Sequence, residues 1–168
     1  SFARMPSPKL KLINIYNIIT DYIKPLSSSF DNVTVEVDNK IENTLIMADE
    51  KQIRQAFNNL IKNSYENITL NKINDGKIII CFGIENDFVT ITINDNGTGI
   101  DKSIISKILE PYYTTKVGNS GLGLAITKKI IDDHNGIILF KPLKQSKGTT
   151  VILKFPLISK LKKEKNKW

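Results

Sequence analysis

Asparagine and glutamate side chains recur at helical spacing near the middle of the chain. Asn59, Asn63 and Glu66 are separated by four and then three residues, so they share one face of a predicted helix, opposite its apolar stripe. Amide and carboxylate oxygens suit a hard cation such as Mg²⁺, which prefers oxygen ligands. A solvated polar face would give the same pattern, because asparagine is common throughout this chain.

A second segment, Asp95 to Ile100, follows an apolar run typical of a strand and contains Gly97 and Gly99. An acid at the end of a strand, followed by residues with little side-chain bulk, places a carboxylate at the edge of a concave space. That carboxylate can accept a hydrogen bond from an exocyclic amine such as that of adenine. An ordinary turn is the alternative, since Asp, Asn and Gly all favour turns.

A third segment, Gly118 to Leu124, runs directly into a predicted helix. Glycines at a helix start let backbone N–H groups approach phosphates, and the helix dipole favours the bound anion. The spacing matches neither the Rossmann nor the Walker A pattern, so a flexible loop followed by a cap is the alternative. In the preceding loop, Lys116 could reach a triphosphate, and two opposite charges ~4 Å apart attract by about 4 kcal/mol at an effective dielectric of 20.

Hydrophobic periodicity predicts the elements that position these segments. Helical repeats predict helices over 9–24, 49–68, 101–109 and 122–134. Asp49 and Gln52 have the spacing of a capping box, and Asn135 with Gly136 should end the last helix. Alternation predicts strands over 33–37, 44–47, 77–84, 88–94, 137–142 and 149–155. We expect the first two strands to pair with each other, and the next two to form a hairpin.

The order of these elements and the composition predict one soluble domain. Strands and helices interleave without regular alternation, which indicates an α+β fold in two layers, a mixed sheet covered on one face by helices. The chain has 168 residues, 40% of them hydrophobic and 24% charged, as expected for a single globular domain. We expect a linker over 1–8, the domain over 9–158 and a basic tail over 159–168.

Charge and cysteine content restrict the class of protein further. Much of the net charge of +7 lies between Lys160 and Lys167, without interleaved aromatic residues, which favours a solvated tail over a nucleic-acid partner. No apolar run approaches the ~18 residues that cross a bilayer. The single cysteine, Cys81, excludes a disulfide framework, so we expect a reducing compartment, the cytoplasm.

Five segments together carry a family resemblance. NNLIKNSYENI, DNGTGID, EPYYTTK, NSGLGLAI and KGTTVILKFP resemble, in order and spacing, the N, G1, F, G2 and final Gly-Thr boxes of histidine kinase ATPase domains. The resemblance covers nearly everything from Asp49 to Pro156. SFARMP at the start also resembles the end of the dimerisation helix in nitrogen-regulation sensor kinases of the NtrB/NtrY type. This resemblance implies a Bergerat-type ATP-binding fold of the GHKL superfamily.

The resemblance implies a role for individual residues. Asn63 would ligate magnesium, Asn59 and Glu66 would line the phosphate side, and Asp95 would accept from the adenine amino group. Asn59, Asn63 and Lys116 would be the catalytic residues, with Lys116 in a mobile lid. The other residues implied to bind ATP are Gly97, Gly99, Ile100, Thr114, Thr115, Ser120, Gly121, Leu122, Gly123, Leu124 and Thr149. Asn119 stands where the family usually has glycine, although asparagine tolerates a left-handed backbone.

The resemblance also implies a reaction and partners. The chain would belong to a two-component signal transduction phosphoprotein, a membrane-bound homodimer that transfers the γ-phosphate of Mg-ATP to a histidine on a dimerisation domain, with a response regulator as the next partner. The only histidine, His134, is near a predicted helix end, where we expect it in the dipole rather than phosphorylated.

Other functions of related ATPases are alternatives. Mismatch-repair, gyrase and heat-shock ATPases have a general-base Glu four residues before the magnesium Asn, and Asn59 at that position favours a kinase over a hydrolase. A serine kinase of the anti-sigma-factor type is one remaining alternative. A degenerate nucleotide-binding interaction domain is the other.

Overall fold

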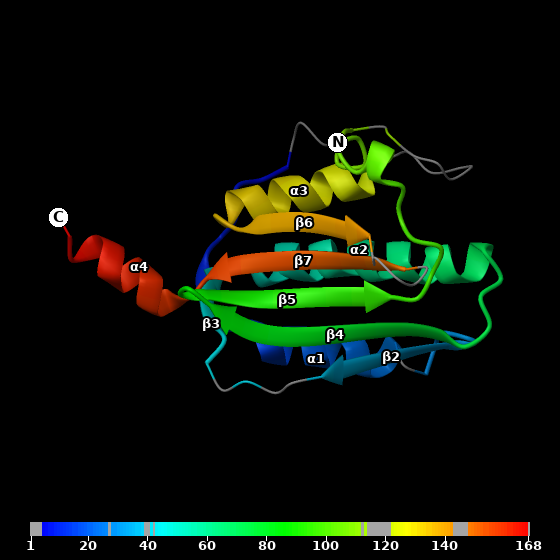
Figure 1. The fold of residues 1–168 in the computed structure, drawn as a ribbon. Coiled ribbons are helices and arrows are strands. Elements are labelled where there is room, and N and C mark those ends of the chain that lie inside the picture. The colour runs from blue at the N-terminus through cyan, green and yellow to red at the C-terminus, as the bar shows by residue number, and fades with distance from the viewer. Residues whose placement is uncertain are drawn as a thin grey trace.

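The computed structural model describes residues 5–26, 28–38, 41, 43–111, 113, 122–142 and 148–167. In chain order its strands and α-helices are β1 Lys11–Asn14, α1 Ile15–Leu26, β2 Val33–Asp38, β3 Leu45–Ala48, α2 Glu50–Leu70, β4 Gly76–Glu85, β5 Phe88–Asp95, α3 Gly123–Asp133, β6 Ile137–Pro142, β7 Thr149–Pro156 and α4 Ile158–Lys165. Five strands form one mixed sheet in the order β2-β4-β5-β7-β6. In Figure 1, α1 and α2 lie behind this sheet, and α3 lies along its β6 edge. The predicted two-layer α+β fold is confirmed.

The hairpin of β4 and β5 forms the centre of the sheet, as predicted. Glu85 pairs with Phe88, and between them Asn86 and Asp87 have φ angles of 50° and 65°. Positive φ at both turn residues matches the right-handed twist of the flanking strands, and Asn and Asp tolerate that backbone well. The turn therefore fixes the register in which Asp95, the last residue of β5, lies opposite Ile78 of β4.

The predicted pairing of the first two strands is wrong. Strand β2 pairs in parallel with β4, with Val33 opposite Gly76, whereas β3 pairs antiparallel with β1 in a separate two-stranded sheet. Val33 and Val35 are buried, so β2 continues the helix-covered face of the main sheet. Closeness along the chain suggested a hairpin, but burial of the two valines decides the pairing.

The helix predicted over 9–24 begins later than expected. Lys11 to Asn14 form β1, and α1 starts at Ile15. The Asn14 side chain accepts a hydrogen bond from the Asn17 backbone N–H at 3.2 Å, and the Ile15 N–H donates to the carbonyl of Thr44 at 3.2 Å. Capping by Asn14 and pairing with β3 outweigh the helical periodicity at this point.

Two further predicted segments differ in type. In place of the helix over 101–109, Asp101 caps a single 3₁₀ turn, Lys102–Ile104, and irregular turns follow. The last residues, predicted as a solvated tail, form the exposed helix α4, which projects from the body in Figure 1 and pairs Lys163 with Asp87 at 3.2 Å. Among the described residues, no helix has the length and apolar character needed to span a membrane.

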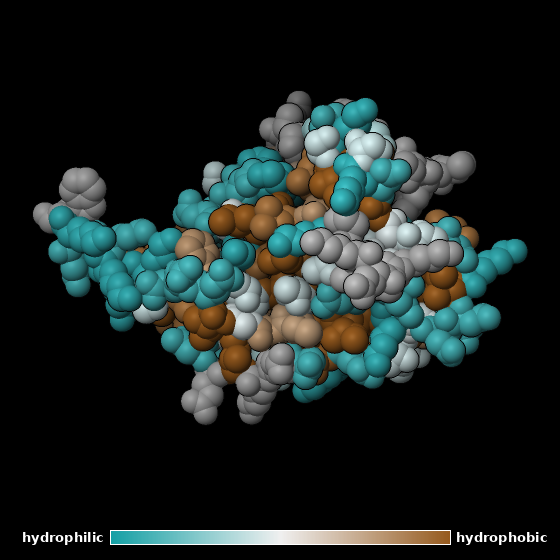
Figure 2. Space-filling view, viewed as in Figure 1, coloured by the Kyte–Doolittle hydropathy of each residue, from teal (hydrophilic) through white to brown (hydrophobic). Residues whose placement is uncertain are grey.

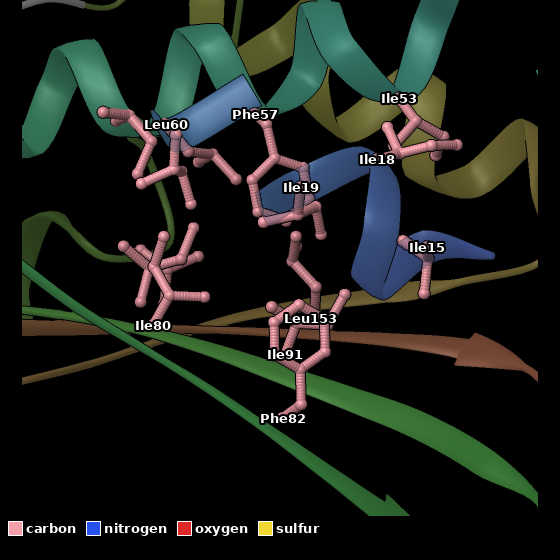
Figure 3. Close-up of a cluster of buried hydrophobic side chains, with 14 of the residues drawn as sticks. Ile15, Ile18, Ile19, Ile53, Phe57, Leu60, Ile80, Phe82, Ile91 and Leu153 are labelled. Carbon is pink, nitrogen blue, oxygen red and sulfur yellow. The ribbon is translucent and has the colours of Figure 1, made fainter. Parts of the chain in front are cut away.

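The core lies between the sheet and helices α1 and α2. Figure 3 shows Ile19 of α1, Phe57 of α2 and Phe82 and Ile91 of the sheet, whose side chains point toward one another. None of the described helices covers the opposite face of the sheet, and apolar patches are visible on that face in Figure 2. The core thus anchors α2, the helix that carries Asn59, Asn63 and Glu66.

Candidate functional site

Helix α2 is fixed by its N-cap and by its buried stripe. The Asp49 carboxylate accepts from the Gln52 N–H at 3.2 Å, as the capping-box spacing predicted, although the side chain of Gln52 turns elsewhere. Asn59, Asn63 and Glu66 are half-buried. They are therefore less exposed than a fully solvated polar face would be, and Asn59 is in contact with the start of α3.

Asn59 joins α2 to the start of α3. Its Nδ2 donates to the Gly123 carbonyl at 3.1 Å and to Thr127 Oγ1 at 3.3 Å, and the Thr127 hydroxyl donates to the same carbonyl at 2.9 Å. The amide of Asn59 is thus used to hold the helix that follows the glycine-rich segment. Four residues further along α2, Asn63 follows, and Glu66 pairs with Lys62 at 3.9 Å.

Asp95 and Thr149 lie side by side at the end of the sheet. They are partners in the register of β5 and β7, and their side chains are only 3% and 2% exposed. Asp95 Oδ1 accepts from the Gly97 N–H at 3.0 Å, while the buried Thr149 hydroxyl has no hydrogen-bond partner within the part of the chain that the structure describes. A buried hydroxyl without a partner is costly, which indicates that a ligand or water group completes this pair.

The two glycines after Asp95 permit close packing of the loop. A Cβ at Gly97 would lie 3.2 Å from Asn67 Cβ, and one at Gly99 would lie 2.9 Å from the Gly148 carbonyl oxygen. Gly99 also has a φ of +84°, a backbone that favours glycine. The loop is thereby held against α2 on one side and against the start of β7 on the other, with Ile100 half-buried beyond it.

The first turn of α3 has no side-chain cap. Leu122 occupies the N-cap position without a side-chain hydrogen bond, and Gly123 and Leu124 follow, both half-buried. The first N–H groups of a helix lack partners within the helix, and they carry the positive end of its dipole. A Cβ at Gly123 would only be in ordinary contact with Asn59 Cγ, at 3.9 Å. This helix start suits an anionic group.

Some predicted site residues lie outside the described part of the chain. These are Thr114, Thr115, Lys116, Ser120 and Gly121. The other predicted residues come together along α2, with Asn59 and Gly123 at one end of the site and Asp95 and Thr149 at the other. Eight residues of helix, from Asn59 to Asn67, separate these ends by about 12 Å.

Asn67 and Asn71 are site residues that the sequence analysis did not identify. The Asn71 Nδ2 donates to Thr98 Oγ1 at 3.3 Å, and Asn67 packs against the position of Gly97. A signal for them exists, because they continue the four-residue spacing of Asn59 and Asn63. Asn59, Asn63 and Asn67 of α2 and the C-cap residue Asn71 thus follow one another at four-residue spacing along the site.

Comparison with known proteins places this geometry in a family. Residues 48–159, well over half of the chain, match the family described as Histidine kinase-, DNA gyrase B-, and HSP90-like ATPase. The chain belongs to this family. It is thus an ATP-binding domain of the GHKL superfamily, and the predicted family is confirmed.

Curated proteins similar to this chain include kinases. The chain is 31% identical over 156 residues to a putative NtrY-like sensor histidine kinase of Rickettsia typhi, covering 93% of this chain and 26% of the relative. It is 39% identical over 129 residues to sporulation kinase B of Bacillus subtilis, covering 77% of this chain and 29% of the relative. The chain therefore spans about a quarter of the length of these curated relatives.

Solved structures agree with this placement. The catalytic domain of the histidine kinase ThkA is 28% identical, with a TM-score of 0.72 over 89% of this chain and 96% of that domain. A second ThkA structure, a complex with the response regulator protein TrrA, gives the same TM-score at 25% identity, over 89% of this chain and 42% of that one. The chain is a catalytic ATPase domain of the histidine kinase type, as predicted.

Proposed function

We propose that this domain presents the γ-phosphate of Mg-ATP to a histidine on a separate dimerisation domain of the same protein. The observation that carries the proposal is the buried pair Asp95 and Thr149. At this end of the sheet, an almost fully buried carboxylate lies beside an almost fully buried hydroxyl for which the described residues supply no hydrogen-bond partner. Such a pair suits the polar edge of adenine, because the carboxylate accepts from the amino group and the hydroxyl completes the contact.

The phosphates would lie about 12 Å away along α2, at the start of α3. There the N–H groups of Gly123 and Leu124 would face the anion, and the N-cap residue Leu122 makes no side-chain hydrogen bond to them. Asn63 would hold magnesium through its amide oxygen, and Glu66 could add a carboxylate contact, directly or through water. When bound, Mg-ATP supplies the phosphoryl group, while Asn63 and the α3 terminus orient it. Thr114, Thr115, Lys116, Ser120 and Gly121 remain proposed lid contacts.

Asn59 is the observation that favours phosphate transfer over hydrolysis. An amide cannot remove a proton from water, and the Nδ2 of Asn59 is committed to Gly123 and Thr127. Among the described residues of α2, no carboxylate takes the position of a general base four residues before Asn63. The phosphoryl group would pass instead to an external imidazole, with bond formation to its nitrogen and loss of ADP.

The partners follow from this proposal. The parent protein would be a cytoplasmic-facing sensor of a two-component system, membrane-bound and dimeric, and its phosphohistidine would serve a response regulator. The complex of ThkA with TrrA supports that partner class. A serine kinase of the anti-sigma-factor type is the second candidate function, because it would use the same nucleotide site.

The test mixes this chain with Mg-ATP and the parent protein's separately produced dimerisation domain. We expect acid-labile, base-stable phosphate on the histidine of that domain, and loss of most of this label with Asn63→Ala. A dimerisation domain whose histidine is replaced by alanine is the matched control and should remain unlabelled. Acid-stable phosphoserine, or labelling that persists without the histidine, would overturn the proposal.

A further inference from the structure

His134 is buried at the end of α3, with only 3% of its surface exposed. Its Nε2 lies 3.0 Å from the backbone nitrogen of Asp49, and its Nδ1 lies 2.7 Å from the Ile130 carbonyl oxygen. A backbone N–H only donates and a carbonyl only accepts, so Nε2 must be bare and Nδ1 must carry the proton. The ring is neutral in this geometry, and His134 lies at the C-terminal end of α3, where the sequence placed it.

The contact with Asp49 fastens one end of α3 to the start of α2. The other end is fastened by Asn59, whose amide donates to the Gly123 carbonyl. Ten residues of α2 separate Asp49 from Asn59, and eleven residues of α3 separate Gly123 from His134, or about 15 and 16 Å of helix. Two antiparallel helices are thus joined at both ends of α3, and these joints fix how far α3 can slide along α2.

The N-terminal segment is tied to the same point. Asp49 Oδ2 accepts from the Lys9 N–H at 2.9 Å, and the Gln52 Nε2 donates to the Pro6 carbonyl at 3.0 Å. Gln52 is 6% exposed, and its buried Oε1 has no hydrogen-bond partner among the residues that the structure describes. Pro6, Lys9, Asp49, Gln52 and His134 therefore form one polar cluster, the Asp49 cluster, where the incoming chain, α2 and α3 meet.

We propose that His134 is a positioning residue for the nucleotide site. It sets the axial position of α3 against α2, and so the position of the N–H groups at Gly123 that face the phosphates. Through Asp49 it also makes that position depend on the segment at Pro6 to Lys9. This inference rests on the proposed function, because it requires phosphates at the start of α3. A shift of α3 along α2 would not move Asp95 and Thr149, which form the adenine end of the site.

The experiment compares nucleotide affinity in the full chain with His134→Phe, which keeps a ring but removes both hydrogen bonds, and His134→Gln, which keeps an acceptor for the Asp49 N–H. Calorimetry with Mg-ATP and with adenosine is the measurement. We expect His134→Phe to weaken Mg-ATP binding about tenfold, as loss of one well-placed phosphate contact would. Adenosine affinity should stay within about twofold, and His134→Gln should restore most of the Mg-ATP affinity.

A second pair of variants tests the N-terminal arm. Lys9 is exposed, so replacement with proline removes its N–H donor without disturbing a buried side chain, and Lys9→Ala is the control that keeps the donor. We expect Lys9→Pro to weaken Mg-ATP binding in the same direction as His134→Phe, and the two changes together to be less than additive. If His134→Phe does not fold, the comparison of Lys9→Pro with Lys9→Ala tests the inference by itself.

The outcomes separate this inference from the proposed function. If the unaltered chain binds no Mg-ATP, the proposed function fails. If it binds Mg-ATP but His134→Phe and Lys9→Pro leave the affinity unchanged and only lower the free energy of unfolding, His134 is merely structural and the inference fails. Equal losses for adenosine and Mg-ATP would overturn it as well, because a shift of α3 should not reach the base.

Discussion

At the residue scale, the buried pair of Asp95 and Thr149 shows what a sequence pattern can and cannot reveal. The acid was predicted from its place after an apolar strand, before Gly97 and Gly99. Thr149 lies far from it in the chain and was identified only through the family resemblance, because the register of β5 against β7 brings the two together. Only the folded chain shows that the buried Thr149 hydroxyl lacks a hydrogen-bond partner among the described residues.

Replacement of Asp95 by asparagine should damage recognition of the base. The side-chain carbonyl of the introduced asparagine could still accept from Gly97, but its amide nitrogen would then present a donor where adenine presents one too. We expect ATP and adenosine affinities to fall together by roughly 10- to 100-fold, equivalent to about 1–3 kcal/mol. Titration calorimetry measures both. Asp101→Asn, an exposed acid-to-amide control in the same loop, should leave both affinities unchanged.

At the scale of elements, periodicity located the helices and strands but not all of their ends or partners. The stripe on α2 and the turn of the β4 and β5 hairpin are local, so the sequence was sufficient for both. The start of α1 was predicted too early, because Asn14 caps that helix and because the residues before it pair with β3 as strand β1. The position of β2 beside β4 depends on burial of Val33 and Val35, which local patterns do not encode.

The cap of α2 should make stability depend on pH. The Lys9 backbone N–H, followed by those of Gln52 and Lys51, holds the pKa of Asp49 below its ordinary value of 3.8. A folded-state pKa below the unfolded one stabilises the fold at neutral pH, and this contribution is lost as the pH falls through the acidic range toward the folded pKa. Asp49→Ala should therefore cost about 1 kcal/mol at pH 7 and less at pH 3.

Urea unfolding of the unaltered chain and Asp49→Ala at both pH values measures this difference. Asp49→Asn keeps a capping oxygen without the charge, so its loss at pH 7 should be the smaller of the two. A difference in unfolding free energy between the unaltered chain and Asp49→Ala that is the same at pH 7 and pH 3 would contradict the role assigned to the charged carboxylate.

At the scale of the whole molecule, one core supports every part of the site. Buried side chains from α1, α2 and the sheet form a single cluster, and Phe57 of α2 lies within it at 1% exposure. The sequence predicted this two-layer arrangement because alternation on the strands and periodicity on α2 each mark one buried face. The order of the strands in the sheet could not be predicted in the same way. The alternation of apolar residues within a strand is the same whichever strand pairs with it.

Phe57→Ala should destabilise the whole domain. Removal of a fully buried ring leaves a cavity between α2 and the sheet, and we expect a loss of about 3–5 kcal/mol. Phe88→Ala is the matched control, because Phe88 is half-buried and stacks under Lys160, so its loss should be clearly smaller. Chemical unfolding followed by circular dichroism gives both values. Equal losses at the two positions would show that Phe57 is not central to the core.

The parallel contact of β2 with β4 has a consequence during synthesis of the chain. An antiparallel neighbour can join a strand as soon as a turn is made, but β2 must wait until β3, α2 and β4 have all left the ribosome. Until then β2 lacks the strand with which it pairs. The first third of this chain is therefore the part that most needs protection from aggregation while the rest is being translated.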